Sequence, residues 1–278
     1  MNPLLLEDQL KQFFNEDIGH DDVSSRMIPE DKRGYATFFV KASGIFCGLE
    51  VIETSYQLFH EPVQITWYKK DGDRCQTGEV ICSVVASYRL LLKTERVILN
   101  LIQHLSGIAT MTAKAVSKLG DAPVKLVDTR KTTPGLRMLE KYAVTCGGGY
   151  NHRYALYDAV MLKENHLACF DSITEAVKRS RQVISHLTKI EVEIETREQL
   201  REAIEVGVDV IMFDNLSPDV ISTWIKDVPS TIVTEASGNI TLDNIATYRD
   251  CGVDFISMGA LTHSTEALDI SLLIKGES

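Results

Sequence analysis

The sequence predicts an α/β protein in two parts, and two patterns in its 278 residues indicate this class. The first third contains short β-rich runs separated by turns, which favours a small β sandwich carrying a helix at 49–59. Beyond Pro123, short apolar runs alternate with helical segments, which is typical of parallel βα units. The later repeats are short, and this favours a barrel over a doubly wound sheet.

The elements of the first part follow from local periodicity. The N-terminal Leu-rich run predicts an amphipathic helix. Apolar residues at helical spacing predict a long helix from Leu90, interrupted at Ser106-Gly107 and resuming to about Leu119. Strands are expected at 35–40, 63–68 and 79–87.

The second part predicts six buried strands separated by helical segments. No GxGxxG follows the first strand and no GxxxxGK[ST] is present, so the Rossmann and P-loop fingerprints are missing. The strands are expected at 125–128, 159–163, 190–194, 208–213, 231–234 and 255–258, and helices at 172–185, 197–205, 218–225 and 242–248.

Composition excludes several classes of protein. The hydrophobic fraction of 44% is enough for a packed core and argues against a disordered or fibrous chain. The net charge of −10 argues against a general nucleic-acid binder. No run approaches the ~20 apolar residues that a membrane span needs. The six cysteines form no CxxC pair, so we expect reduced cytosolic thiols and neither a disulfide framework nor a zinc site.

Charge is nevertheless distributed unevenly along the chain. Residues 125–163 contain seven Lys/Arg and three acids, a balance of +4, whereas residues from Lys189 onward contain six Lys/Arg and 17 acids, a balance of −11. A basic segment in an acidic protein indicates a focused anion site, and a solvated basic face is the alternative.

Basic side chains follow two of the predicted strands. In a βα barrel, the carboxyl ends of the strands meet at one mouth, where active sites lie. Cations gathered there repel one another unless an anion joins them, so the expected ligand is polyanionic. Gly147–Gly149 nearby serves either as a flexible helix end or as a ligand cradle. The basic candidates are Arg130, Lys131, His152, Arg153 and Lys163.

Acidic side chains follow other strands and suit a cation. Glu193 and Asp214, at neighbouring strand ends, could hold Mg²⁺, which prefers carboxylates, waters and substrate phosphates. Glu191 and Glu195 share the face of Glu193 by strand alternation, with Glu191 deeper. The alternative is that these acids pair with the Lys/Arg groups. A phosphate is expected after the last two strands, at 237–239 and 257–259.

Eight stretches of the sequence carry a family resemblance: EDIGHDDVSS, ERVILNLIQHLSGIAT, DTRKTTPGLRMLEKYAV, GGGYNHR, KENH, EVEIET, MFDN and EASGNI. Together they resemble the quinolinate phosphoribosyltransferase family over essentially the whole chain. The departures are small: Glu164 stands where the family commonly has Asp, and Asn239 where it commonly has Gly. A paralogous group linked to molybdate uptake differs around the KENH-like stretch.

The resemblance implies an architecture and a reaction. It implies an N-terminal α/β sandwich domain over 1–110 and a C-terminal, incomplete α/β barrel of about six parallel strands over 111–278, with the extreme C-terminus able to pack back on the first domain. It also implies a cytoplasmic homodimer that uses Mg²⁺ and touches neither nucleic acid nor membrane. The implied reaction converts quinolinate and 5-phosphoribosyl 1-pyrophosphate to nicotinate mononucleotide, CO₂ and pyrophosphate in de novo NAD biosynthesis.

The resemblance also implies residue roles. The implied catalytic residues are Lys131, Glu193 and Asp214, the last two also holding Mg²⁺. The implied quinolinate ligands are Arg130, His152, Arg153 and Lys163, together with Arg96 of the partner subunit. The implied cradle for the 5′-phosphate is Ser237, Gly238, Asn239 and Gly259.

Three other interpretations are open at this point. A nicotinate-specific transferase would bind one carboxylate and need fewer cations than this segment offers. The hairpin at 71–78 is similar to lipoyl or biotinyl carrier turns, but Lys69 and Lys70 precede the turn instead of lying at its tip. A catalytically inactive phosphate sensor would not need Lys131, Lys163, Glu193 and Asp214.

Overall fold

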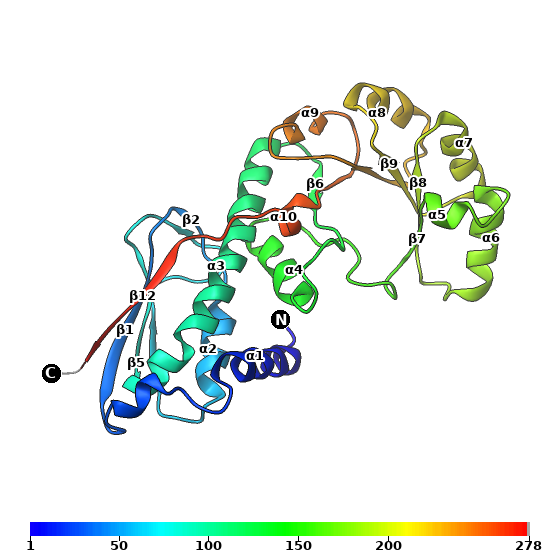
Figure 1. Ribbon diagram of the computed structural model, residues 1–278. Helices are drawn as coiled ribbons and strands as arrows, with labels where there is room; N and C mark the ends of the chain where they lie inside the picture. Colours follow the sequence, from blue (N-terminus) through cyan, green and yellow to red (C-terminus); the bar gives the residue numbers. More distant parts are fainter. Residues whose placement is uncertain (277–278) are drawn as a thin grey trace. The chain divides into compact units, whose positions relative to one another are not determined.

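The computed structural model describes residues 1–276, which form two compact units (Figure 1). The first unit contains Met1–Ala113, Thr133–Gly148 and the segment from Ser264 onward, and the second contains Lys114–Thr132 and Gly149–His263. Within residues 1–276, no helix is both long enough and apolar enough to cross a bilayer.

The first unit is built on a four-stranded antiparallel sheet in the order β12-β1-β5-β3. Residues alternate along β1, so that Ala36, Phe38 and Val40 are fully buried. The strands are β1 (Arg33–Val40), β3 (Gln64–Trp67), β5 (Val80–Ser87) and β12 (Ile270–Gly276), with a small ladder of β2 (Gly44–Ile45) and β4 (Arg74–Cys75). The helices are α1 (Pro3–Ile18), α2 (Leu49–Gln57), α3 (Tyr88–Leu119), α4 (Arg137–Cys146) and the 3₁₀ turn Ser24–Met27.

Helix α3 is one unbroken helix, so the expected interruption at Ser106-Gly107 is wrong. Ser106 is fully buried, and its hydroxyl accepts the Cys47 amide at 3.0 Å and donates to the Cys47 carbonyl at 3.2 Å. A Cβ at Gly107 would lie 2.2 Å from the Glu266 carbonyl oxygen. The two residues that read as breakers are therefore small because neighbouring backbone lies against this turn of the helix.

Each compact unit is assembled from segments that are not contiguous in the sequence. Helix α3 runs through residue 110. Helix α4, expected in the barrel domain, belongs to the first unit, where buried Glu140 lies 2.8 Å from His104 on α3. Strand β12 also belongs there because it pairs with β1 from Gly34↔Gly276 to Val40↔Ile270. Tertiary pairing thus assigns both segments to the first unit.

The second unit confirms the predicted incomplete barrel of six parallel strands. Their order is β6-β11-β10-β9-β8-β7, which leaves β6 and β7 at the edges. The strands are β6 (Lys125–Val127), β7 (Val160–Leu162), β8 (Ile190–Ile194), β9 (Val210–Asp214), β10 (Val233–Ser237) and β11 (Phe255–Ser257). The helices are α5 (Glu164–Leu167), α6 (Ile173–Val183), α7 (Arg197–Val206), α8 (Pro218–Trp224), α9 (Ile245–Tyr248), α10 (Ala260–His263) and the 3₁₀ turn Ile225–Asp227.

Two strands extend further toward their carboxyl ends than the apolar pattern predicts. Strand β9 includes Asp214, and β10 begins at Val233 and continues through Glu235 to Ser237. The register places Glu193 and Glu235 on either side of Met212, in one row across β8, β9 and β10. Charged side chains therefore belong to the sheet itself, at the end where a barrel site forms.

The Gly107 contact gives a stability prediction. Gly107→Ala should lower the free energy of unfolding by about 1–3 kcal/mol, although Ala favours helix, because the new methyl group meets a backbone oxygen. Asn100→Ala, at an exposed position of α3, is the matched control and should change stability by no more than about 0.5 kcal/mol. Urea unfolding measures both variants, and an unchanged or raised midpoint for Gly107→Ala would contradict this packing.

Candidate active site

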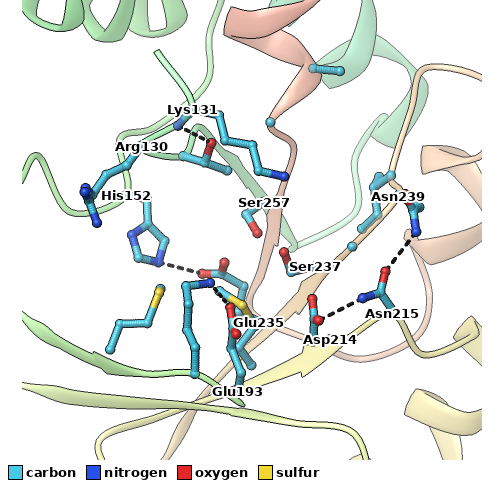
Figure 2. A pocket seen from close by; sticks show the side chains of 18 of the residues that line it. Arg130, Lys131, His152, Glu193, Asp214, Asn215, Glu235, Ser237, Asn239 and Ser257 are labelled. Atoms are coloured by element: carbon cyan, nitrogen blue, oxygen red, sulfur yellow. Dashed lines mark hydrogen bonds and ion pairs between the residues drawn. The ribbon is translucent and has the colours of Figure 1, made fainter. Parts of the chain in front are cut away.

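A cavity of about 650 Å³ opens at the carboxyl ends of the parallel strands, entirely within the second unit. Its lining combines cations, carboxylates and glycines (Figure 2). Every expected site residue except Arg96 lines it: Arg130, Lys131, His152, Arg153, Lys163, Glu193, Asp214, Ser237, Gly238, Asn239 and Gly259.

Two arginines, Arg130 and Arg153, line the cavity and form its cationic part. The Arg130 Nε is buried and has no hydrogen-bond partner in the described residues. Arg153 donates through one terminal nitrogen to the Ala159 carbonyl at 2.7 Å. Burial and the like charge of Arg130 lower the pKa of the Arg153 guanidinium. Because the charge of Arg130 acts on Arg153, an anionic ligand that neutralises both is favoured.

Lys163 behaves differently, because it forms an ion pair with Glu193. Burial raises the pKa of Glu193, and the hydrogen bond from Lys163 opposes that rise. The alternative that these acids pair with Lys/Arg groups therefore holds for Glu193 and Lys163. The acid comes from β8, outside the segment 125–163 over which charge was counted, and the parallel pairing of β7 with β8 brings the two together.

His152 sits above two buried carboxyl groups. Its Nδ1 accepts the Arg153 amide hydrogen at 2.7 Å, which leaves the ring proton on Nε2. That Nε2 lies 3.1 Å from Glu191 and 3.5 Å from Glu235. Burial, then the nearby Glu191 charge, raise the pKa of Glu235 to about 7. Below that pH Glu235 is mainly protonated.

Glu235 is a site residue that the sequence analysis missed. It appears among the sequence patterns only within the stretch EASGNI, although it aligns with Met212 beside Glu193 in the register. Glu191 was expected to share the Glu193 face at greater depth, and the structure confirms that placement, with Glu191 only 4% exposed. The sequence signal that could have identified Glu235 is a glutamate directly after a predicted strand, in a sheet where another strand has further glutamates. The residues paired with these glutamates in the sheet are all apolar.

Buried Asp128 orients the loop that carries the cations. Its carboxylate accepts the His152 amide at 2.9 Å and the Asn151 side-chain amide at 2.6 Å. Asp128 is fully buried at the end of β6. It therefore fixes the position of the loop that carries His152 and Arg153.

Lys131 lies across Gly259. Its carbonyl accepts the Thr262 hydroxyl at 2.7 Å, and its amide donates to the Thr129 hydroxyl at 3.0 Å. A Cβ at Gly259 would lie 2.9 Å from Lys131 Cδ. Glycine at 259 thus leaves room for the lysine side chain to reach the cavity.

The opposite wall of the cavity is a chain of polar groups. The Asn239 amide donates to Asn215 Oδ1 at 2.9 Å, and the Asn215 amide donates to Asp214 at 2.8 Å (Figure 2). Gly238 has φ +92°, and a Cβ there would lie 2.3 Å from Asn215 Oδ1. Asn239 has φ 53°, which is a conformation that glycine adopts freely and asparagine tolerates best among the other residues. Asn215, also left-handed at φ 55°, is a second residue that the sequence analysis missed.

Arg96 does not belong to this cavity. It lies on α3 in the first unit, its side chain is 61% exposed, and Glu95 is 4.0 Å away. Nothing in this chain's own cavity assigns it a role.

Comparison with known proteins identifies the architecture. Residues 21–106 match the model of the quinolinate phosphoribosyl transferase N-terminal domain, and residues 108–273 match that of the C-terminal domain. A probable nicotinate-nucleotide pyrophosphorylase [carboxylating] of Bacillus subtilis is 53% identical over 98% of this chain and 94% of its own. The chloroplastic nicotinate-nucleotide pyrophosphorylase [carboxylating] of Arabidopsis thaliana is 38% identical over 96% of this chain and 82% of its own.

A solved structure agrees with these relatives. The crystal structure of NadC from Streptococcus pyogenes superposes with a TM-score of 0.96 at 40% identity, covering 100% of this chain and 99% of that one. Both domain models, full-length relatives and a full-length structure therefore agree, and this chain belongs to the quinolinate phosphoribosyltransferase family.

Proposed function

We propose that this chain transfers the phosphoribosyl group of 5-phosphoribosyl 1-pyrophosphate to quinolinate, giving nicotinate mononucleotide, CO₂ and pyrophosphate in de novo NAD biosynthesis. The observation that carries the proposal is the cavity, whose lining includes Glu193, Asp214 and two arginines. These arginines, Arg130 and Arg153, form no ion pair among the described residues. A pyridine dicarboxylate suits the arginines, and a phosphorylated sugar suits the carboxylate-lined part. We further propose that the enzyme is a cytoplasmic homodimer.

Quinolinate binding is assigned to the cationic part. Arg130 and Arg153 can each present a planar fork of N–H donors to a carboxylate. His152 orients the Arg153 amide and lines the same part of the cavity. Lys163 forms an ion pair with Glu193, so we place its ammonium group where the quinolinate site meets the phosphoribosyl site.

The transfer step is electrostatic. Pyrophosphate leaves C1 of the ribose, the quinolinate nitrogen bonds to that carbon, and the positive ring nitrogen then eases loss of CO₂ from C2. The Glu193 and Asp214 carboxylates stabilise positive charge on the sugar, and the Lys131 ammonium stabilises the leaving pyrophosphate. Gly238 and Gly259 leave their backbone exposed to the 5′-phosphate, beside Ser237 and Asn239. No nucleophilic side chain is required.

A magnesium ion fits the carboxylate pair of Glu193 and Asp214. Glu193 and Asp214 provide carboxylate oxygens from adjacent strands, both lining the cavity. Mg²⁺ favours such oxygen ligands and keeps several waters and substrate phosphates. When bound, it would supply charge compensation for the pyrophosphate.

Release of CO₂ tests the reaction directly. The protein is incubated with Mg²⁺, 5-phosphoribosyl 1-pyrophosphate and quinolinate labelled in the 2-carboxyl group. We expect labelled CO₂ and nicotinate mononucleotide in equal amounts, and neither when the sugar pyrophosphate is omitted. Absence of both products from folded protein would overturn the proposal, as would faster consumption of nicotinate than of quinolinate.

The first prediction concerns the cationic part. Arg153→Ala should weaken quinolinate binding by about 1.5–3 kcal/mol, since a charge-assisted hydrogen bond is lost, and Lys163→Ala should weaken it as well. Calorimetric titration with quinolinate measures the affinity, and circular dichroism checks the fold. Arg179→Ala, at an exposed arginine of α6, is the matched control and should bind as the wild type does. Unchanged affinity in both site variants would remove these residues from the quinolinate site.

A second prediction concerns the Asp214 carboxylate. Asp214→Asn should remain folded and lose most turnover, because the amide keeps the shape but removes a charge that serves both Mg²⁺ and the sugar. Asp219→Asn, at an exposed position of α8, should keep full turnover. Turnover is measured over a range of Mg²⁺ concentrations and in excess chelator. Full activity without divalent cations would contradict the assignment.

The third prediction concerns Arg96. We propose that Arg96 acts in the active site of the partner subunit, as a two-fold dimer permits. Arg96→Ala and Lys163→Ala should each be nearly inactive alone. A mixed dimer has one site with both residues intact and one with neither, so random mixing should restore about a quarter of wild-type activity.

Subunit exchange is the control for that experiment. Co-expression with two different affinity tags, followed by tandem purification, isolates the mixed dimers. If these dimers are no more active than the separate variants, Arg96 does not act across the interface.

A further inference from the structure

Two thiols meet in the first unit, although they are far apart in the sequence. Cys47 lies between β2 and α2, and Cys146 is the last residue of α4. Their sulfur atoms and a carboxylate oxygen of Asp71 all lie within 4.8 Å of one another. Cys47 is fully buried, whereas Cys146 is partly accessible.

Packing against α3 fixes both cysteines. The Cys47 backbone exchanges two hydrogen bonds with the Ser106 hydroxyl, at 3.0 and 3.2 Å. A Cβ at Gly48 would lie 2.5 Å from Ile102, and a Cβ at Gly147 would lie 2.4 Å from the Ala109 carbonyl. Both residues that follow the cysteines therefore press their backbone onto the same helix, and this contact keeps the thiols together.

The nearby carboxylate is already occupied. Asp71 Oδ1 accepts the Gly48 amide at 2.7 Å and the Leu49 amide at 3.0 Å, which caps the start of α2. Asp71 Oδ2 accepts the Tyr142 hydroxyl at 2.8 Å. A metal ion would have to displace these bonds to gain a third protein ligand, whereas a bond between the two sulfurs leaves them in place.

The two thiols also differ in reactivity. The Cys47 thiol beside it lowers the pKa of Cys146, while burial raises the pKa of Cys47 well above its usual value. Thiolates are the nucleophiles in thiol chemistry. Cys146 is thus both the accessible sulfur and the one that ionises first, and Cys47 is a protonated thiol poised next to it.

We propose that Cys47 and Cys146 form a reversible intrachain disulfide under a peroxide oxidant. The Cys146 thiolate attacks a peroxide oxygen, the O–O bond breaks, and a sulfenic acid and hydroxide form. The Cys47 sulfur then attacks the Cys146 sulfur and loses its proton, and water leaves. The two sulfurs supply the two electrons that reduce hydrogen peroxide to two molecules of water, and an added dithiol reverses the bond.

The bond has a structural consequence that can be measured. It closes a loop of about 100 residues, which removes much freedom from the unfolded chain. It also fixes the end of α4, from which the chain continues through Gly147–Gly149 to His152. The oxidised protein should therefore melt several degrees above the reduced one.

Peptide mapping after oxidation tests the proposal. The full-length protein is treated with hydrogen peroxide, free thiols are blocked with N-ethylmaleimide, and unreduced digests are analysed by mass spectrometry. We expect a linked pair of peptides containing Cys47 and Cys146, lost on dithiothreitol treatment, and a higher melting temperature. Cys169→Ser is the matched control. It removes an exposed cysteine just after α5 and should change neither the linked peptides nor the melting temperature.

The single variants separate the two roles. Cys47→Ala should leave Cys146 as a sulfenic acid that dimedone traps, and Cys146→Ala should leave Cys47 unoxidised. If Cys47→Ala does not fold, Cys47→Ser replaces it. Free Cys47 and Cys146 after oxidation of the wild type would overturn the proposal, as would an equivalent of zinc that co-purifies and is lost in Cys146→Ala.

Discussion

Buried charge at the carboxyl edge of the six-stranded sheet is the constraint on which the rest of the site depends. Glu191, Glu193 and Glu235 all have side chains at least largely removed from water, and such groups are costly unless each is paired or protonated. Lys163 neutralises Glu193, and His152 faces the other two. The raised pKa of Glu235 lets it keep a proton near neutral pH. Arg130 and Arg153 form no ion pair among the described residues, so their charge is available to a ligand.

The rest of the cavity is arranged around this balance. Asp128 fixes the loop that brings His152 and Arg153 over the buried acids. Gly259 leaves space for Lys131, and Gly238 lets its backbone approach Asn215. Each of these contacts positions a charged or amide group at the cavity, and none of them places an apolar side chain there. The site can therefore hold two substrates whose anionic groups lie on opposite sides of one reacting bond.

Much of the second unit follows from its sequence because short strand-like runs alternate with helical segments. The strand Ile190–Ile194 was predicted to the residue, and helix Arg197–Val206 to within one residue. Two strands end later than predicted, where polar side chains at the strand end line the cavity. Strands β9 and β10 continue to Asp214 and Ser237, since the site, not solvent, receives their side chains.

Other features depend on contacts between distant segments. Ser106-Gly107 reads as a helix break, yet Cys47 and Glu266 account for both residues. The Lys163–Glu193 pair escapes a charge count made along one segment. The role of Glu235 needs the strand register, and the role proposed for Arg96 needs a second subunit, which no spacing in one chain can indicate.

We expect Arg130 and Arg153, which form no ion pair among the described residues, to select a dicarboxylate. Calorimetric titration of the wild-type protein with quinolinate and with nicotinate, in the same buffer and salt, tests it most directly. The second carboxylate should add about 1.5–3 kcal/mol of binding free energy, so quinolinate should bind at least about ten-fold more tightly. Equal affinities for the two compounds would contradict the account.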